Sequence, residues 1–167
     1  MLKIALLTRE HDRNRFDCGI PELNQFLKST ARQHGDKGIS RTFVLNEDEP
    51  AILGFYTLTL GEIEAKQLPS RYAKKYPGHG LPAVRLARLA VSIRQQRKGY
   101  GELLLFDAIQ RTVVIADQAG ITGLFVDAKN ESACIFYEKY GFIRCNDKHL
   151  QLFLPVETLR SSLSVDA

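Results

Sequence analysis

The sequence has few cysteines, no long hydrophobic run and no clustered histidines, and each absence argues against a class of protein. The three cysteines (Cys18, Cys134 and Cys145) are an odd number without C-x-x-C spacing, so neither a disulfide framework nor a zinc site is indicated. No apolar run approaches the ~20 residues that span a bilayer, and residues 1–7 are too short for a signal peptide. The four histidines lack metal-ligand spacing. We therefore expect a cytoplasmic protein with no bound metal and no membrane contact.

Acidic residues are missing from a long internal stretch. No Asp or Glu occurs between Lys66 and Lys98, whereas nine of the 23 basic residues lie there. All 19 acidic residues lie elsewhere, so one basic segment interrupts an otherwise acidic chain of net charge +4. Such asymmetry indicates either a polyanionic ligand near the segment or a solvated basic loop.

Length and hydrophobic periodicity predict an α/β (α+β) layer architecture. A chain of 167 residues with 44% hydrophobic composition suits one packed domain, expected over residues 1–160 with a C-terminal tail over 161–167. Strands are predicted at residues 2–7, 41–45, 51–60, 84–93, 121–128 and 150–154, the last followed by a turn at Pro155. Helices are predicted at 21–33, from the Gly99/Gly101 segment to about 119, and at 131–140. Residues 62–83 show little periodicity and are expected to be a functional loop, unless partly helical.

The segment Gln96-Arg97-Lys98-Gly99-Tyr100-Gly101 follows a predicted strand and opens a long predicted helix. Glycines let the backbone turn and approach a ligand closely, and a helix N-terminus adds positive potential and unpaired N–H groups. The charges of Arg94, Arg97 and Lys98 suit further phosphates. The pattern predicts a pyrophosphate cradle, with a turn that binds nothing as the alternative. It is no P-loop, because no Gly-Lys-Ser/Thr follows, and it lacks the third glycine of a dinucleotide fingerprint.

A second motif runs from Asn130 to Phe142 and contains two tyrosines on a predicted helix. Tyrosines on such helices are usually core residues with the hydroxyl at the edge. Near an acyl thioester, however, a phenol can donate its proton to a leaving thiolate, because both groups have pKa values near 8–10. Tyr137 is the preferred candidate for this role, and Tyr140 competes with it.

Taken together, these motifs resemble the GCN5-related N-acetyltransferase (GNAT) superfamily over about residues 2–154. The superfamily pattern is carried by Leu89-Ala90-Val91, Gln96-x-x-Gly99-x-Gly101, and Asn130 with Phe136-Tyr137-x-x-x-Gly141-Phe142. Further short motifs resemble those of the tRNA-acetylating toxins of bacterial type II toxin–antitoxin modules. These are Phe16-x-Cys18-Gly19, Leu23-Asn24-x-Phe26-Leu27, Arg41-Thr42-Phe43-Val44, Leu53-Gly54-Phe55-Tyr56-Thr57-Leu58, Arg85-Leu86-Ala87-Arg88-Leu89-Ala90-Val91 and Leu152-Phe153-Leu154-Pro155-x-x-Thr158-Leu159.

The resemblance implies the GNAT fold, with a single mixed, mostly antiparallel central sheet flanked by helices, and acetyl-CoA as co-substrate. It implies that Leu89-Ala90-Val91 meets the pantetheine through the backbone of Leu89 and Val91, and that Gln96 to Gly101 wraps the pyrophosphate. Asn130 would contact the pantetheine arm, and Tyr137 would act as general acid toward the CoA thiolate. Residues 1–160 would form one GNAT acetyltransferase domain. Homodimers are common in the resembling branch, and a ribbon–helix–helix antitoxin is the implied partner.

The predicted strand over residues 84–93 contains no acidic residue that could deprotonate an attacking amine. A lysine side chain, with a pKa near 10.4, needs such a base, whereas an α-amine near pKa 8 is already partly neutral. The missing acid therefore favours a weakly basic α-amine as acceptor, although Glu62 or Glu64 could supply the base from elsewhere.

Aminoacyl-tRNA accounts for both the α-amine and the basic charge that CoA leaves unused. We expect it to be bound by Arg71, Lys74, Lys75, Arg85 and Arg88, with the aromatic residues of 71–76 available for base stacking. Acetylating the charged tRNA would inhibit translation. The alternatives are an N-acetyltransferase for a small amine or protein N-terminus, and a non-catalytic acyl-CoA-binding regulatory module. Cys134 and Cys145 are expected to be packing residues, and Asp17-Cys18-Gly19 to form a turn.

Overall fold

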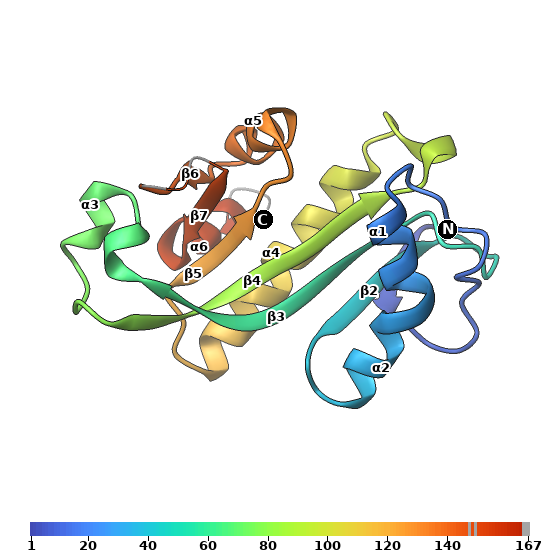
Figure 1. Ribbon diagram of the computed structural model, residues 1–167, viewed down its shortest axis with the longest axis horizontal. Helices are drawn as coiled ribbons and strands as arrows, with labels where there is room; N and C mark the ends of the chain where they lie inside the picture. The colour runs from blue at the N-terminus through green and yellow to red at the C-terminus, as the bar shows by residue number, and fades with distance from the viewer. Residues whose placement is uncertain (147, 149, 165–167) are drawn as a thin grey trace. The chain divides into compact units, whose positions relative to one another are not determined.

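The computed structural model describes residues 1–146, 148 and 150–164. Strands and helices are interspersed along the chain (Figure 1). The strands are β1 (Lys3–Leu6), β2 (Arg41–Asn46), β3 (Gly54–Glu64), β4 (Gly80–Val91), β5 (Gly123–Asp127), β6 (Ile143–Arg144) and β7 (Gln151–Pro155). The helices are α1 (Pro21–Gln25), the π-helix η1 (Phe26–Thr30), α2 (Ala31–Asp36), α3 (Ser70–Ala73), α4 (Tyr100–Gln118), α5 (Glu131–Lys139) and α6 (Val156–Ser164), with 3-10 turns η2 (Ala65–Gln67) and η3 (Ile93–Gln95).

The strands form one seven-stranded sheet in the order β1-β2-β3-β4-β5-β7-β6. β1 and β3 pair antiparallel with β2, and β5 and β6 pair antiparallel with β7. The crossover through α4 makes β4 and β5 parallel, in a register that places Val84 opposite Leu124. The predicted mixed, mostly antiparallel sheet flanked by helices is confirmed. None of the helices in the described ranges is long and apolar enough to cross a membrane.

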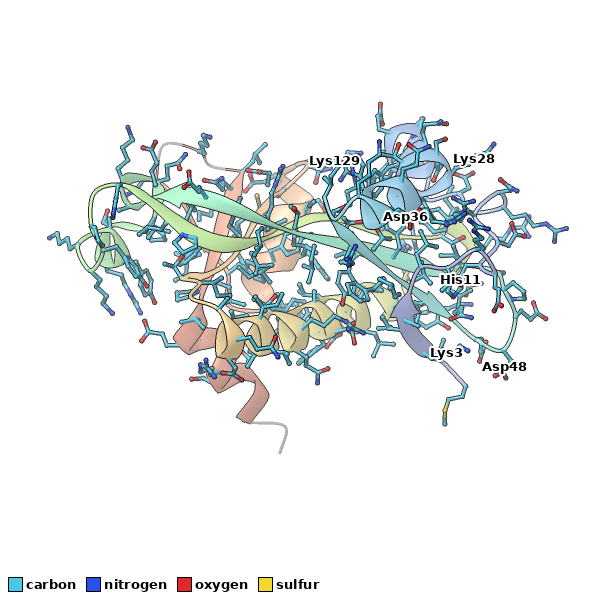
Figure 2. All side chains as sticks on the ribbon, turned by 90° about the horizontal axis from the view of Figure 1, so that it is seen from below. Lys3, His11, Lys28, Asp36, Asp48 and Lys129 are labelled. Carbon is cyan, nitrogen blue, oxygen red and sulfur yellow. The ribbon has the colours of Figure 1, made fainter. Side chains whose placement is uncertain are left out.

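The chain divides into two compact units, and the division falls within β3, β4 and α4. The first unit comprises Met1–Thr59 and Ala87–Ala108, and the second comprises Leu60–Leu86 and Ile109–Ala167. In the first unit α1 and α2 lie against β2 and β3 (Figure 1), and the core between them contains Phe26, Val44 and Phe55. Charged side chains such as Lys28 and Asp36 stay exposed on this helical run (Figure 2).

The core of the second unit gathers around the β5–β7 pair. Phe125 and Phe153 lie opposite each other in that pair and pack with Tyr72 of α3 and with Cys145. Gly123, at the start of β5, has no room for a side chain, because an added Cβ would lie 2.3 Å from the carbonyl oxygen of Leu154. Close strand packing therefore requires glycine at this position.

Several element boundaries differ from the sequence prediction. The predicted helix 21–33 is continuous to Asp36 but contains the π-helical turn η1, which periodicity alone does not reveal. The expected loop 62–83 is largely ordered, since it contains the end of β3, η2, α3 and the start of β4. β6 is too short for a periodic signal. The turn expected at Pro155 is wrong: proline lacks an N–H for a sheet ladder, so β7 ends there, and α6 follows directly.

Candidate active site

The predicted cradle forms the connection between β4 and α4 in the first unit. Gln96 turns back on the strand, and its Nε2 donates a hydrogen bond to the carbonyl oxygen of Val91 at 3.1 Å. Arg97 (φ 66°) and Gly99 (φ 82°) both have left-handed backbone conformations, and Arg97 is the one described non-glycine residue to do so. Such conformations cost about 1–3 kcal/mol for a residue with a side chain and concentrate at ligand sites.

The first turn of α4 supplies backbone donors at this connection. The intrahelical hydrogen bonds begin at Leu103, whose N–H donates to the carbonyl oxygen of Gly99 at 3.1 Å. The N–H groups that precede it have no intrahelical acceptor, as at every helix start. A Cβ at Gly99 would meet nothing within 4 Å, and Arg97 and Lys98 are exposed beside it. An open, positively charged helix start with exposed backbone fits a diphosphate.

A polar turn at residues 17–19 is hydrogen-bonded to the segment that leads into the cradle. Oδ1 of Asp17 accepts hydrogen bonds from the N–H of Gly19 and from Nδ2 of Asn24, both at 2.9 Å. These bonds lower the pKa of the Asp17 carboxyl. The carbonyl oxygen of Asp17 accepts from the N–H of Ile93 at 2.8 Å, at the start of the turn that leads into the cradle. The predicted turn at Asp17-Cys18-Gly19 is therefore confirmed, and it is joined to the predicted site.

Close packing between β3 and α4 sets the position of the helix that begins at the cradle. Gly54 of β3 leaves space for Leu104, and a Cβ there would lie 2.8 Å from Cδ1 of Leu104 and 2.9 Å from the carbonyl oxygen of Ala90. Further along the same contact, the hydroxyl of Tyr56 donates to Oδ2 of Asp107 at 2.5 Å. The N-terminal half of α4 is thus held by both shape and a hydrogen bond.

Residues 88–91 of β4 alternate between the two faces of the strand. Val91 lies toward α4, where its Cγ2 is 3.5 Å from the position of a Cβ on Gly54. Ala90 belongs to the core beneath α1 and η1. Arg88 shares that face, and its guanidinium carbon lies 3.6 Å from the centroid of the Phe26 ring. Leu89 is half-buried and lies on the same face as Val91 because side chains alternate along a strand.

Asn130 and Tyr137 belong to the second unit and lie on one helix. Asn130 is the N-cap of α5, and its Oδ1 accepts a hydrogen bond from the N–H of Ala133 at 2.9 Å. Tyr137 is 6% exposed, and burial raises the pKa of its phenol well above the ordinary value. Its ring packs against Phe136 and Phe142. The neighbouring Tyr140 is half-buried at the C-terminal end of the helix.

Arg144 of β6 holds both ends of α5. Its guanidinium donates to both carboxylate oxygens of Glu131, in the first turn, and to Oε1 of Glu138, in the last, at 2.5–3.1 Å. Glu131 and Glu138 are two helical turns apart, so one cation spans the length of the helix that carries Tyr137. Sequence reasoning missed this clamp because only the β6 pairing brings Arg144 beside the helix.

The basic residues predicted to bind tRNA differ in what they contact. Arg85 forms an ion pair with Asp127 at 3.2 Å, and Lys75 pairs with Glu157 at 3.7 Å. Arg71 donates to the hydroxyl of Tyr72 at 2.7 Å. Lys74 is exposed and has no partner in the described part of the chain. The prediction that Tyr72 stacks on bases is wrong, because its ring is buried against Phe153.

The remaining chemical groups play structural roles. Glu64 caps η2 through a capping box with Gln67 and pairs with Lys66 at 3.2 Å. Cys134 and Cys145 are buried thiols. Burial raises the pKa of both, that of Cys145 to about 12, so neither provides a ready thiolate. Among the described residues, no group of three or more His, Cys, Asp or Glu side chains could hold a metal ion.

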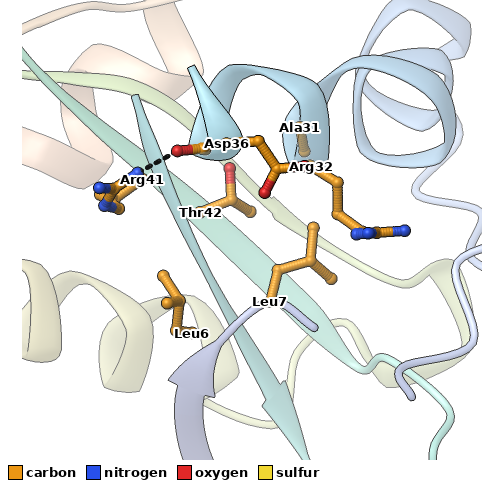
Figure 3. A pocket seen from close by; sticks show the side chains of 8 residues that line it. Leu6, Leu7, Ala31, Arg32, Asp36, Arg41 and Thr42 are labelled. Carbon is orange, nitrogen blue, oxygen red and sulfur yellow. Dashed lines mark hydrogen bonds between the residues drawn. The ribbon is translucent and has the colours of Figure 1, made fainter. Parts of the chain in front are cut away.

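A pocket in the first unit lies apart from the predicted site residues (Figure 3). It has a volume of about 250 Å³, and its lining consists of Leu6, Leu7, Ala31, Arg32, Gly35, Asp36, Arg41 and Thr42. Arg41 donates from Nη1 to the carbonyl oxygen of Gly35 across one wall. None of the residues predicted to bind CoA or tRNA lines this pocket.

Comparison with known proteins identifies the family. The family model described as "Acetyltransferase (GNAT) domain" matches residues 24–152. The chain is 35% identical over 160 residues to "Probable toxin TacT" of Sinorhizobium fredii (strain NBRC 101917 / NGR234), covering 90% of this chain and 88% of that protein. It is 33% identical over 150 residues to "tRNA-acetylating toxin" of Mycobacterium tuberculosis (strain ATCC 25618 / H37Rv), covering 90% and 89%. The chain belongs to the GNAT acetyltransferase family.

Solved toxin structures share the fold over nearly the whole chain. AtaT complexed with acetyl-methionyl-tRNAfMet superposes with a TM-score of 0.90 at 34% identity, covering 98% of this chain and 99% of that one. An AtaT variant bound to the C-terminus of the antitoxin AtaR and acetyl-CoA superposes with a TM-score of 0.82 at 31% identity, covering 98% of each chain. The predicted GNAT fold and resemblance to the toxin branch are confirmed.

Proposed function

We propose that this chain is a toxin that transfers the acetyl group of acetyl-CoA to the α-amino group of an aminoacyl-tRNA and so inhibits translation. The observation that carries the proposal is the likeness to AtaT, which has been solved with the product of this chemistry, an acetylated aminoacyl-tRNA. The open cradle before α4 supports acetyl-CoA as donor. The exposed Lys74, which has no partner in the described part of the chain, and the acid-free strand β4 support a large anionic acceptor with a weakly basic amine.

The first unit would bind the donor. Backbone N–H groups from Gln96 to Gly101 would receive the pyrophosphate, and the exposed Arg97 and Lys98 would contact its charges. Leu89 to Val91 would present backbone groups to the pantetheine arm. The hydrogen bond from Ile93 to Asp17 fixes the segment before the cradle, and the close packing of Leu104 on Gly54 fixes the helix after it. Both are in place before the ligand binds, which lowers the entropic cost of binding.

Tyr137 would donate the proton that the departing CoA sulfur requires. When the amine nitrogen forms its bond to the thioester carbonyl carbon, the carbon–sulfur bond breaks and the thiolate leaves, and the attacking nitrogen loses a proton to solvent. The raised pKa keeps the Tyr137 phenol protonated throughout the physiological range. A thiolate in apolar surroundings is also a stronger base than in water, as the buried thiol of Cys145 illustrates, with its pKa raised to about 12. Burial would therefore raise the pKa of the CoA thiol together with that of the Tyr137 phenol.

The acceptor amine would enter without help from a carboxylate on β4. That strand, Gly80–Val91, contains no Asp or Glu, and Glu64 is engaged in its capping box. An α-amine with a pKa near 8 is about one-tenth neutral at pH 7, compared with less than one part in a thousand for a lysine side chain. An aminoacyl ester therefore suits this site better than a lysine.

One assay tests the proposal against its rivals. The purified protein is incubated with labelled acetyl-CoA and offered bulk charged tRNA, uncharged tRNA, polyamines and peptides in parallel. We expect label on charged tRNA alone, and release of that label with the amino acid after mild alkaline hydrolysis of the ester. Label on polyamine or peptide but not on charged tRNA would contradict the proposal and favour a small-amine or N-terminal acetyltransferase.

Replacing Lys74 by alanine should weaken the tRNA substrate more than replacing Arg85. Lys74 has no partner among the residues that the structure describes, whereas the charge of Arg85 is already neutralised by Asp127 at 3.2 Å. We expect the KM for charged tRNA to rise in Lys74→Ala and its dependence on log salt to fall by about 0.7–0.9 per lost phosphate contact. Lys3→Ala, on an exposed lysine of β1, is the matched control. Equal effects of all three substitutions would mean that only net charge matters.

Replacing Asn130 by aspartate should separate its capping role from its proposed contact with pantetheine. Aspartate caps a helix as well as asparagine does, so we expect thermal stability to be retained, whereas Asn130→Ala should lose about 1 kcal/mol. The amide donor, however, is absent in both variants. We expect about three- to tenfold weaker acetyl-CoA binding by calorimetry in Asn130→Asp. Unchanged binding in that variant would leave Asn130 as a cap alone.

The partners and location follow from the same proposal. The AtaT variant has been solved with the C-terminus of the antitoxin AtaR, which supports an antitoxin partner for this chain. We propose that the partner is of the ribbon–helix–helix type, that the toxin forms a homodimer and that it acts in the cytoplasm, where charged tRNA is found. Co-expression followed by light scattering would measure both assemblies.

A further inference from the structure

The ring of Phe26 is a fixed platform beneath the guanidinium of Arg88. It is 5% exposed, and it stacks on Phe55 with an interplanar angle of 24° and a centroid distance of 6.4 Å. Phe55 in turn meets Phe16 edge-on at 5.4 Å. His34 meets the Phe26 ring edge-on at 5.8 Å. These contacts hold the ring in place. The guanidinium carbon of Arg88 lies 3.6 Å from the ring centroid.

The π-helical turn η1 brings this ring to its position. The N–H of Ala31 donates to the carbonyl oxygen of Phe26, five residues earlier, so one residue more than in an α-helical turn separates the two. Phe26 and Ala31 both face the core, a coincidence that a regular α-helix at 100° per residue does not give for residues five apart. Isolated π-turns within α-helices are concentrated at functional sites.

Arg88 lies next to the strand residues that are proposed to bind the donor. Leu89 is its neighbour in β4, and the alternation of the strand puts Arg88 on the opposite face, together with Ala90 and beneath η1. Arg88 therefore lies one residue from the backbone groups that are proposed to meet the pantetheine arm, with its guanidinium on the face opposite α4.

We propose that the π-turn and Phe26 hold Arg88 in a preset orientation, so that its guanidinium binds a phosphate at the single-stranded 3′ end of the charged tRNA. Phe26 is the positioning residue in this arrangement. The inference rests on the proposed function and adds to it the device that places the acceptor end. Stacking engages the face of a guanidinium, whereas its five N–H donors lie in the plane. A bidentate phosphate contact uses two of them, so other partners of Arg88 are compatible with it.

The stack contributes to binding by ordering the side chain before the substrate arrives. An unsupported arginine loses much of its rotamer freedom when it forms a bidentate contact, and this loss opposes binding. On the Phe26 platform that freedom is already restricted in the free enzyme. Loss of the ring should therefore weaken tRNA binding without any change in charge and without any change in donor binding.

The test is a double-mutant cycle between Phe26→Leu and Arg88→Met, with steady-state kinetics on charged tRNA and calorimetry of acetyl-CoA binding. Leucine keeps an apolar side chain beneath the arginine, and methionine keeps an apolar stem without the charge. We expect Phe26→Leu to raise the KM for charged tRNA by about three- to tenfold, the cost of ordering one long side chain. The same substitution should have no effect in the Arg88→Met background, and Phe26→Tyr should restore the original KM.

Phe16→Leu is the matched control, because it removes another ring of the same cluster, the one that packs edge-on against Phe55. We expect its KM for charged tRNA to equal that of the unmodified protein, with acetyl-CoA affinity retained in every variant. A rise in KM for Phe16→Leu, or an equal effect of Phe26→Leu with and without Arg88, would reduce Phe26 to a packing residue and overturn the inference. Failure of the unmodified protein to acetylate charged tRNA would overturn the proposed function itself.

Discussion

Replacing Tyr137 by phenylalanine should lower kcat by about two to four orders of magnitude while leaving the affinity for acetyl-CoA unchanged. The range is that of a lost general acid. Tyr137 is almost fully buried, and its ring packs against Phe136 and Phe142, contacts that phenylalanine preserves. Removal of the hydroxyl thus removes a proton donor and little else. Stopped-flow or steady-state transfer to charged tRNA measures kcat, and calorimetry measures donor binding.

Tyr140→Phe is the matched control, since Tyr140 lies one turn further on and caps the same helix. We expect kcat to stay within about twofold of the unmodified protein, because Tyr137 is the predicted proton donor. If kcat falls in Tyr140→Phe and not in Tyr137→Phe, Tyr140 is the acid. If neither variant loses activity, the proton comes from water.

Replacing Gly54 by alanine should destabilise the fold and weaken donor binding together. The new Cβ would lie 2.8 Å from Leu104 and 2.9 Å from the carbonyl oxygen of Ala90, and a backbone atom cannot rotate away. Such overpacking costs about 1–3 kcal/mol, or about 2–4 °C of Tm per kcal/mol in a domain of this size. Since α4 begins at the cradle, a shift of Leu104 should also raise the Kd for acetyl-CoA.

Gly120→Ala provides the control for the backbone effect of any glycine-to-alanine change. A Cβ at Gly120 meets nothing within 4 Å, and the residue is exposed. We expect its Tm to equal or slightly exceed that of the unmodified protein, because alanine restricts the unfolded chain. A Gly54→Ala protein as stable as Gly120→Ala would mean that β3 and α4 adjust to the added methyl group.

Periodicity and the glycine motif predicted the order of the main elements and the start of α4, because both depend on local sequence. The short strand β6 and the last helix, α6, were less predictable. β6 has two residues, and its position depends on pairing with β7, which no local pattern encodes. Helix α6 follows Pro155 directly, where a proline read locally indicates a turn.

The candidate site shows the same division between local and long-range information. The charge of the basic segment was visible in the sequence, but Asp127 and Glu157, which pair with Arg85 and Lys75, lie 42 and 82 residues further along the chain. Tyr72 looked like a stacking aromatic because basic residues surround it, whereas it fills the core beside Phe153. The hydrogen bond from Ile93 to Asp17 likewise joins two motifs that sequence reasoning treated separately.

The extra residue in η1 makes this short helical run unusually sensitive to insertions and deletions. A chain that lacked one residue of Phe26–Thr30 could still form a helix from Pro21 to Asp36, and a regular one. Every side chain before the deletion would then turn by about 100° relative to those after it. The aromatic ring would leave Arg88 although each amino acid around it was retained. The number of residues in this segment, more than their identity, should therefore separate chains that keep the ring beneath the arginine from those that have lost this contact.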